Sequence, residues 1–287
     1  MPLFQQMTIV GVGLLGASLA RACREKGIVN RVCGFGRTRG TLEEAKRRGI
    51  IDAFGDTLST SVKGSDLVVV CSPVTSIAPL VREMLPTLRE GCLLTDVGSV
   101  KGPVVREIES FLPDRVRFVG SHPIAGGEKS GLNASTSNLF RRAKCIVTPT
   151  AKTDSGALEQ TRQLWHGVDM DVIEMDMDEH DLVFGAVSHL PHIVAFALMN
   201  TVGSLRTAHY DNVASFSGGG LKDITRIASS DPVMWRDICI SNRQAILDMI
   251  ERFQGDLEQT RQWIERNESL PLEQSFQNAN RYRMNLA

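Results

Sequence analysis

Residues 7–20, MTIVGVGLLGASLA, decide the fold of this 287-residue chain, because an apolar run passes directly into a glycine-rich turn and then into a helical pattern expected over 15–26. Gly11, Gly13 and Gly16 have the spacing G-x-G-x-x-G. Between a strand and a helix, the first glycine permits a tight turn. The second lets backbone amides approach a pyrophosphate, and the third allows close helix–strand packing. The stretch therefore predicts a dinucleotide-binding βαβ unit.

The dinucleotide preference should be set at the end of the second expected strand, over 32–36. NAD-preferring sites carry an acid about 20 positions after the glycine turn, whereas this chain has Gly36 followed by Arg37 and Thr38. A guanidinium suits a 2′-phosphate, so NADP is favoured over NAD. If Arg37 is only solvated, NAD can still bind through Thr38 and backbone groups. The expected cofactor contacts are Gly11, Gly13, Leu14, Leu15, Gly16, Gly36, Arg37, Thr38, Ser72 and Pro73.

Apolar runs and helical patterns alternate as far as residue 175. Near-continuous apolar runs are typical of strands covered on both faces. Alternation of strand and helix predicts a Rossmann-type doubly wound, mostly parallel sheet over residues 1–175. Further strands are expected over 67–73, 92–98, 116–123, 144–150 and 170–176, and further helices over 42–48, 77–88, 104–111 and 158–165.

The strand pattern stops at about residue 176. Residues 177–205 predict one long buried helix with a kink at Pro191, because proline lacks a backbone donor. Asp231-Pro232 predicts the start of another helix, about 30 residues long and reaching past Trp263. That length exceeds what a small domain normally buries. Residues 176–287 are therefore expected to form an all-helical domain for substrate binding and homodimerisation.

Composition excludes several classes of partner. Lys+Arg 32 against Asp+Glu 33 gives a net charge of -1, so no global field draws the chain to nucleic acid or to a membrane. Residues 183–205 carry two histidines and a proline, and we expect them to be too polar for a membrane span. Six cysteines without C-x-x-C spacing indicate buried thiols in a reducing compartment. With no signal-peptide pattern at the N-terminus, we expect a cytoplasmic protein.

Histidine chemistry is expected near one strand end. His122 lies at the end of an apolar run and precedes Pro123. Doubly wound folds bind ligands at the carboxyl ends of strands, and the ordinary pKa of an imidazole suits a general base. Ser99, at another strand end, is expected to orient the ring by a hydrogen bond. A purely structural role is the alternative for a lone loop histidine.

Two further groups of polar residues are candidates for substrate binding. Lys222 and Arg226 lie four apart at the start of an expected helix after three glycines, which predicts an anion site for carboxylates. The alternative is a surface pair between Asp223 and Arg226. His189 and His192 lie three apart and lack a third ligand at suitable spacing, so we expect substrate contacts and no metal.

Several segments, in order from about residue 7 to 260, resemble the prephenate dehydrogenase and arogenate dehydrogenase family of tyrosine biosynthesis. These segments are GVGLLGASLA, DVGSVK, GSHPIAGGEKSG, SHLPH, and GGGLKDITRIA followed by D-P-x-x-W. The resemblance implies a Rossmann domain joined to a helical dimerisation domain. It also implies NAD(P)-dependent oxidative decarboxylation of prephenate to 4-hydroxyphenylpyruvate, without a metal. Arogenate dehydrogenase and dual-specificity cyclohexadienyl dehydrogenase are the alternatives within the family.

The resemblance also implies roles for single residues. His122 matches the catalytic base, Ser99 its hydrogen-bond partner, and Arg226 the arginine that binds the ring carboxylate. Further matches near the substrate are His192 and Trp235 in the pocket, Glu128 at its mouth, and Gly219 and Asp223 near or across the dimer interface. Gly36-Arg37 departs from the acidic pattern of NAD-preferring members. We expect no regulatory or mutase domain of the kind that some relatives carry, so any feedback by tyrosine is expected at the active site.

Two alternative functions can be distinguished from a dehydrogenase of this family by particular residues. A β-hydroxyacid dehydrogenase or an imine reductase shares the expected layout but typically uses a lysine or aspartate on the long helix, where this chain has histidines. A non-catalytic dinucleotide sensor would make His122 replaceable. The dehydrogenase reading requires His122 and Arg226 to converge on a nicotinamide held by the glycine turn.

Overall fold

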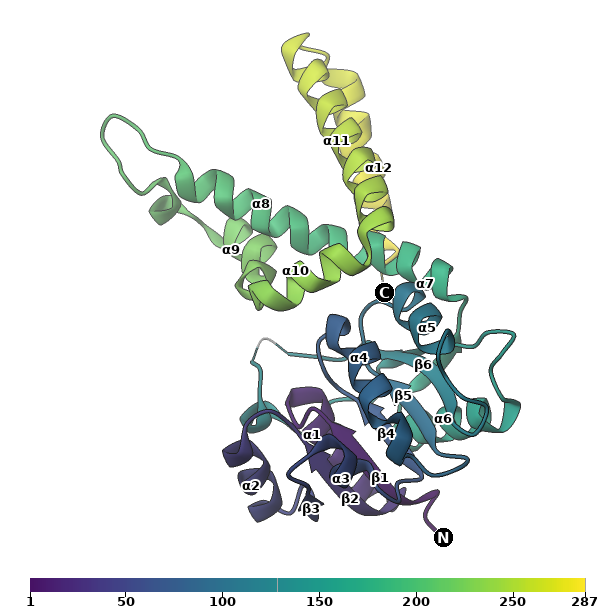
Figure 1. The fold of residues 1–287 in the computed structure, drawn as a ribbon. Coiled ribbons are helices and arrows are strands. Elements are labelled where there is room, and N and C mark those ends of the chain that lie inside the picture. Colours follow the sequence, from purple (N-terminus) through teal and green to yellow (C-terminus); the bar gives the residue numbers. More distant parts are fainter. Residues whose placement is uncertain (128, 287) are drawn as a thin grey trace.

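The computed structural model describes residues 1–127 and 129–286. An α/β unit forms the lower part of the molecule in Figure 1, and helices form the upper part. Among the described residues, eight strands form one sheet in the order β3-β2-β1-β4-β5-β6-β7-β8. The strands are β1 (Phe4–Val10), β2 (Val29–Phe35), β3 (Ala53–Phe54), β4 (Leu67–Val70), β5 (Leu93–Asp96), β6 (Arg117–Pro123), β7 (Lys144–Thr148) and β8 (Asp171–Glu174).

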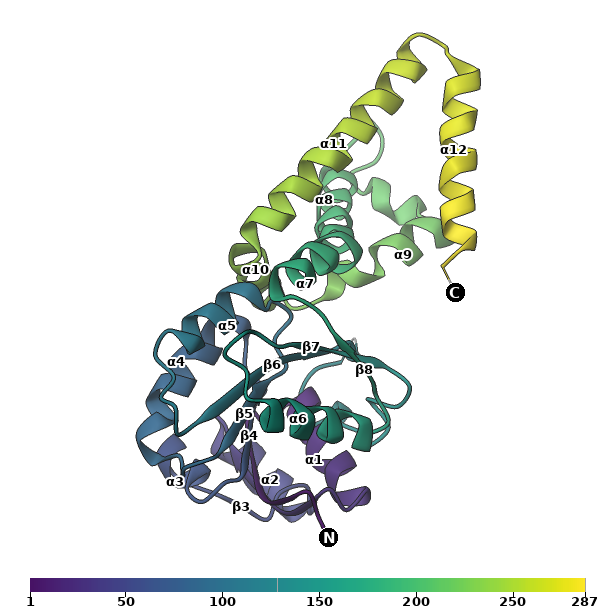
Figure 2. The same ribbon diagram turned by 90° about the vertical axis from the view of Figure 1, so that its right-hand side faces the viewer.

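The sheet confirms the predicted doubly wound, mostly parallel architecture. Adjacent strands pair in parallel except β6 and β7, which are antiparallel. The two-residue strand β3 was not predicted, because so short a segment shows no period. Helices cover both faces (Figure 2). They are α1 (Leu14–Glu25), α2 (Arg39–Arg47), α3 (Leu58–Val62), α4 (Val74–Met84), α5 (Gly102–Glu109) and α6 (Ser155–Gly167), with short turns η1 (Leu85–Thr87) and η2 (Leu132–Ala134).

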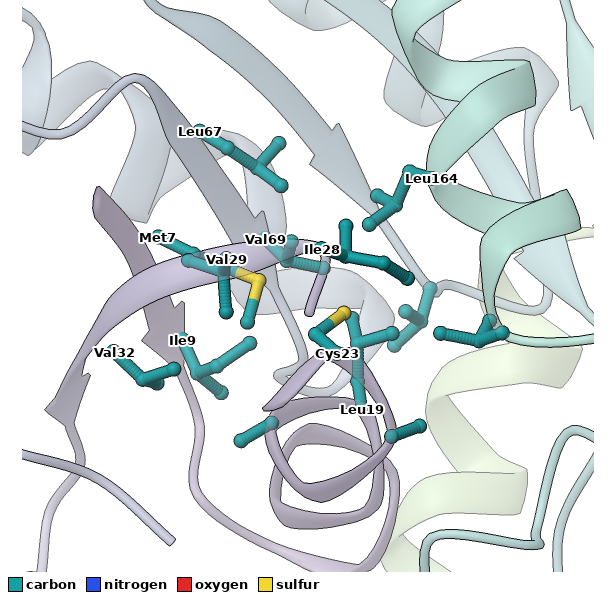
Figure 3. Packing of buried hydrophobic residues seen from close by; sticks show 14 of the residues in the cluster. Met7, Ile9, Leu19, Cys23, Ile28, Val29, Val32, Leu67, Val69 and Leu164 are labelled. Carbon is teal, nitrogen blue, oxygen red and sulfur yellow. The ribbon is translucent and has the colours of Figure 1, made fainter. Parts of the chain in front are cut away.

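Two apolar clusters pack on the two faces of the sheet. In the first, Met7 and Ile9 of β1 lie against Leu19 and Cys23 of α1, and Leu164 of α6 closes the same cluster (Figure 3). The second lies under α3, α4 and α5 and includes two residues of the helical part, Trp235 and Ile238. Since burial of a large apolar side chain contributes roughly 1.5–3 kcal/mol, this second cluster holds the helical part against the sheet.

The helical part begins with a continuous helix over residues 177–204, as expected, but its middle is a π-helical turn. Its pieces are α7 (Met177–Phe184), the π turn η3 (Gly185–His189) and α8 (Leu190–Ser204). Pro191 is the second residue of α8 and directly follows the π turn, so its missing backbone donor lies where the type of helix changes. The expectation that this helix is buried is wrong within the chain, because Ala195 is the one buried residue of α8.

The same helix is more apolar than the sequence analysis predicted. Met177–Ser204 is long and apolar enough to cross a membrane by length and composition, with a mean hydropathy of 1.8 in its most apolar window. The expectation that the segment is too polar for this is therefore wrong. Two histidines and a proline do not outweigh its run of alanine, valine, leucine and phenylalanine. The large apolar side chains of α8 are half-buried and not fully exposed.

Shorter helices complete the chain. They are η4 (Val213–Phe216), α9 (Gly219–Thr225), η5 (Arg226–Ser229), α10 (Pro232–Ser241), α11 (Arg243–Glu265) and α12 (Ser269–Met284). Asp231 caps α10 as expected, since its Oδ1 accepts a hydrogen bond from the Met234 N–H at 2.7 Å. The predicted 30-residue helix is divided at Asn242 into α10 and α11. From the tip of α11 the chain turns back into α12, of which no described residue is buried (Figure 2).

Candidate active site

The glycine turn after β1 has the geometry of a pyrophosphate cradle. Gly11 has φ +106°, and a Cβ there would lie 2.3 Å from the Cys71 carbonyl oxygen. A Cβ on Gly16 would lie 2.2 Å from the Gly11 oxygen, so this glycine permits close helix–strand packing. A Cβ on Gly13 would meet nothing within 4 Å. The backbone before α1 is thus open to a ligand, and the helix N–H groups face it without a side-chain cap.

The other expected cofactor residues gather at the same sheet edge. Because β2, β1 and β4 are parallel neighbours, the residues after their carboxyl ends lie side by side. Gly36 and Arg37 follow β2, and Ser72 and Pro73 follow β4. Arg37 and Thr38 are exposed, and Thr38 is the residue before α2. The residues present therefore fit a dinucleotide that lies across these strand ends, and when bound it would supply a hydride acceptor.

His122 lies within β6, inside the strand expected over 116–123, so its description as a loop histidine is wrong. It pairs with Ile146 of β7, and its side chain is 9% exposed. Since β6 runs parallel to β5, His122 reaches the same edge of the sheet as the glycine turn. Its Nδ1 lies 2.9 Å from Nε2 of His180 on α7. In turn, Nδ1 of His180 lies 2.8 Å from Asp181 Oδ1.

The hydrogen bond to His180 replaces the one expected from Ser99. Ser99 is half-buried after β5. Among the residues that the structure describes, no hydrogen bond joins its side chain to the imidazole of His122. His180 and Asp181 were not predicted from the sequence. The available signal was a histidine and a carboxylate, adjacent in the apolar 177–205 helix, both of which are buried in the fold.

A buried ion pair lies beside the imidazole. Lys101 and Asp96 form a salt bridge with both side chains 0% exposed, and Lys101 Nζ also donates to the Ser121 carbonyl at 2.9 Å. Burial lowers the pKa of His122 well below its ordinary value, and the proximity of three other basic groups, His180, Lys101 and His189, lowers it further. The imidazole is therefore neutral at neutral pH, which is the state that accepts a proton.

Helices of the second domain supply two buried N–H donors. His189 is 1% exposed, and its Nδ1 lies 3.0 Å from the amide nitrogen of Asn242. Since that nitrogen donates, the remaining His189 Nε2 carries the proton. Within the described part of the chain, His189 Nε2 and Trp235 Nε1 are buried and have no hydrogen-bond partner. Two such donors in a largely apolar wall suit the oxygen atoms of a small anion.

His192 and Arg226 complete this side of the site. The ring of His192 stacks on Trp235 at 3.7 Å, and its Nδ1 donates to the Ser188 carbonyl at 3.0 Å. Burial lowers the pKa of His192, and the charge of Arg226 lowers it further. Arg226 is exposed and begins η5, so it does not share a helix with Lys222 as expected.

A chain of contacts extends from the candidate base into the helical part. It runs from His122 through His180, Asp181, Asn242, His189 and Trp235 to His192. Lys222, Asp223 and Gly219 lie exposed on α9 nearby. Glu128 lies outside the described residues. No group of three metal-ligating side chains occurs within 1–127 and 129–286.

Comparisons with known proteins cover nearly all of this chain. Residues 19–174 match the family described as "Prephenate dehydrogenase, nucleotide-binding domain", and residues 176–278 match "Prephenate dehydrogenase, dimerization domain". The chain is 37% identical to the prephenate dehydrogenase of Bacillus subtilis over 96% of its own length and 74% of that protein. It is 30% identical to the cyclohexadienyl dehydrogenase of Zymomonas mobilis over 100% and 97% of the two chains.

A solved structure is similar over the whole fold. A crystal structure of prephenate dehydrogenase from A. aeolicus, in complex with hydroxyphenyl propionate and NAD+, superposes with a TM-score of 0.93. The two chains are 38% identical, and the match covers 99% of this chain and 98% of the other. Both the sheet and the helices are therefore arranged as in that enzyme.

Proposed function

The chain belongs to the prephenate dehydrogenase family of oxidoreductases, and we propose that it converts prephenate to 4-hydroxyphenylpyruvate and CO2 with a nicotinamide dinucleotide as hydride acceptor. One observation carries the proposal. A buried, neutral imidazole, His122, lies at the sheet edge that holds the glycine turn, and a chain of contacts extends from it to His192, whose pKa the charge of Arg226 lowers. These observations support the proposal that a base, a dinucleotide cradle and an anion-binding group share one site.

The proposed chemistry needs one proton acceptor and a rigid substrate site. His122 accepts the proton of the ring 4-hydroxyl while hydride leaves C4. Loss of the ring carboxylate as CO2 then makes the ring aromatic, and the proton returns from His122 to the ring oxygen. Because aromatisation drives the reaction, the protein needs chiefly to align the reacting atoms and bind a dianion.

Prephenate, rather than arogenate, is the proposed substrate. Both carry a ring carboxylate, for which Arg226 and Lys222 provide cations. They differ in the side chain, which is a pyruvyl group in prephenate and an amino acid in arogenate. His192, stacked on Trp235, offers an imidazole to that side chain, and by analogy with the family it suits a pyruvyl group better than an ammonium group.

NADP is the proposed dinucleotide. Gly36 stands where NAD-preferring sites carry an acid, and the exposed Arg37 follows it. Its guanidinium is available to a 2′-phosphate, whereas Arg39 is paired with Glu43 and Asp56. This preference would be supported by a higher kcat/KM for NADP+ than for NAD+. It would also be supported if Arg37→Ala lowered the ratio of kcat/KM for NADP+ to kcat/KM for NAD+. A strong NAD+ preference in the wild-type protein would exclude it.

The active protein is proposed to be a cytoplasmic homodimer. Large apolar side chains are exposed along the helical part, among them Phe216, Ile224, Leu257, Leu270 and Phe276. A second copy of the chain would cover them, in keeping with the dimerization-domain match. Four of the six free cysteines are buried, which suits a reducing compartment.

The decisive experiment measures absorbance of the reduced nicotinamide with prephenate and arogenate offered separately, each with NADP+ and NAD+. We expect the highest kcat/KM for prephenate with NADP+. Faster turnover of arogenate would replace the proposed substrate with its amino-acid counterpart. No turnover of either substrate with either dinucleotide would overturn the proposed function.

A further inference from the structure

His180 stands between the candidate base and a buried carboxylate on a different element. His122 lies on β6 of the sheet, whereas His180 and Asp181 lie on α7 of the helical part. We propose that His180 and Asp181 are positioning residues that hold His122 in the tautomer able to accept a proton at Nε2. This inference rests on the proposed function, because it assigns how that reaction's base is prepared.

The first step concerns Asp181, whose carboxylate is fixed by three N–H donors. Oδ1 accepts a hydrogen bond from the Lys101 backbone N–H at 2.8 Å, and Oδ2 accepts one from the Gly102 N–H at 2.9 Å. Its third contact is Nδ1 of His180. These backbone donors anchor the carboxylate at the start of α5. A carboxylate so surrounded acts as an acceptor, so His180 Nδ1 carries the hydrogen.

The second step follows along the two rings. Burial is the main cause that lowers the pKa of His180, so this ring is neutral at neutral pH. With its proton on Nδ1, its Nε2 is a bare acceptor. Nδ1 of His122, 2.9 Å away, must then donate. The proton of the neutral His122 ring therefore lies on Nδ1, and Nε2 is left with the lone pair that a general base requires.

The third step concerns the rigidity of this arrangement. Phe184 lies one turn after His180, and its ring centroid is 4.8 Å from that of His122 and 4.5 Å from that of His180. Phe184 is 7% exposed. The aromatic ring packs on both imidazoles, which excludes water as a competing partner. The pair therefore keeps one geometry, and orientation of a base is a large part of its catalytic effect.

Charge compensation gives the carboxylate a second role. While His122 holds the substrate proton, the charged and polar groups around it decide how stable its imidazolium form is. The titratable groups near it are His180 and Asp181 of α7, His189 of η3, Asp96 and Lys101 around β5, and Cys145 of β7. Asp96 is paired with Lys101. Asp181 reaches His122 through one intervening ring, so it can stabilise the imidazolium through His180.

The test compares two substitutions at one position. His180→Gln keeps an oxygen able to accept from His122 Nδ1, whereas His180→Phe keeps the packing against Phe184 and removes the acceptor. We expect His180→Phe to lower kcat for prephenate by about 10- to 100-fold with KM changed less than about twofold. We expect His180→Gln to recover part of that loss. Leu182→Ala, on an exposed position of the same helix, is the matched control and should behave as wild type.

A pH profile separates positioning from folding. In Asp181→Asn the imidazolium of the His122–His180 pair loses its counter-charge, so the acidic limb of kcat/KM should move to lower pH as kcat falls. A smaller folded fraction would scale the profile without moving it. Wild-type kcat and an unchanged limb in both His180→Phe and Asp181→Asn would overturn the inference. So would equal losses in the two His180 variants accompanied by equal falls in melting temperature.

A measurement without turnover keeps this test independent of the proposed function. In protein labelled with 15N-histidine, the nitrogen shifts should show Nδ1 of His122 protonated and Nε2 bare in the wild type, and a mixture of tautomers in His180→Phe. Assignment uses His122→Asn. If wild-type protein turns over neither prephenate nor arogenate, the proposed function fails while the tautomer result still stands. If His122 carries its proton on Nε2, the positioning role fails even in an active enzyme.

Discussion

The imidazole of His192 lies stacked on the indole of Trp235, with the ring planes inclined by 21°. The two rings come from α8 and α10, and Trp235 also belongs to the apolar cluster on the sheet. One aromatic side chain thus belongs both to the candidate site and to the contact between the two parts of the chain. The spacing between the anion-binding group and the base therefore depends on this packing.

Removal of the base should affect the chemical step. We expect His122→Asn to lower kcat by about 10²- to 10⁴-fold with little change in substrate affinity, because a general base acts mainly in the transition state. Steady-state kinetics with prephenate and direct substrate titration provide the two numbers. Undiminished turnover would remove His122 from this role.

Removal of the cation should affect binding instead. We expect Arg226→Ala to raise KM for prephenate by about 10- to 100-fold, since a charge-assisted hydrogen bond contributes roughly 1.5–3 kcal/mol. Lys152→Ala is the control. This exposed lysine follows β7, and because β7 runs antiparallel to β6, Lys152 lies at the edge of the sheet opposite to the candidate site. An unchanged KM in Arg226→Ala would point to another group as the carboxylate clamp.

The buried ion pair between Asp96 and Lys101 should contribute to the free energy of unfolding. Lys101→Met leaves the carboxylate of Asp96 buried without its cation, and we expect the free energy of unfolding to fall by about 3–5 kcal/mol. The double variant Asp96→Asn/Lys101→Met removes both charges and should lose less. Urea denaturation measures both. A single variant as stable as wild type would show that the pair does not hold the β5–α5 loop.

Buried histidines should make the fold sensitive to acid. Burial lowers the pKa of His122 and His180, and lowers that of His189 from its ordinary value of 6.5 to about 4. Between these two pKa values, His189 binds more protons in the unfolded chain than in the folded protein. The free energy of unfolding therefore decreases as the pH falls from 6.5 towards 4. Urea midpoints at pH 7 and pH 5 measure the loss.

Two histidine variants test the origin of that acid sensitivity. His189→Asn should reduce the difference between the two urea midpoints, because asparagine has no proton to gain in this range. The exposed His209 is the control, and His209→Asn should leave the difference unchanged. Equal pH dependence in wild type and His189→Asn would contradict the assignment to this buried ring.

The dinucleotide half of the site could be predicted from the sequence because its chemistry is local. Three glycines lie within six residues, and for two of them, Gly11 and Gly16, the fold leaves no room for a Cβ. The alternation of strands and helices likewise depends on short apolar periods. These features are decided by neighbours along the chain, which is where a single sequence is informative.

The catalytic half depends on contacts between distant segments. His180 meets His122 only because α7 packs on the carboxyl end of β6, and no short period marks a distance of 58 positions. The break at Asn242 has a similar cause, since its side chain bonds to the Asp181 carbonyl and to His189. Apolar periodicity over 232–263 is compatible with one helix, and only these tertiary hydrogen bonds end it.

The π turn η3 separates His180, which faces the sheet, from His192, which faces α10. Each residue of an ordinary helix advances the direction of its side chain by about 100°, and a π turn accommodates an extra residue in that rotation. The π turn at Gly185–His189 takes up one residue more than an α-helical path would need for about the same rotation. The helix can therefore carry this additional residue while His180 still faces the sheet and His192 still faces the indole of Trp235.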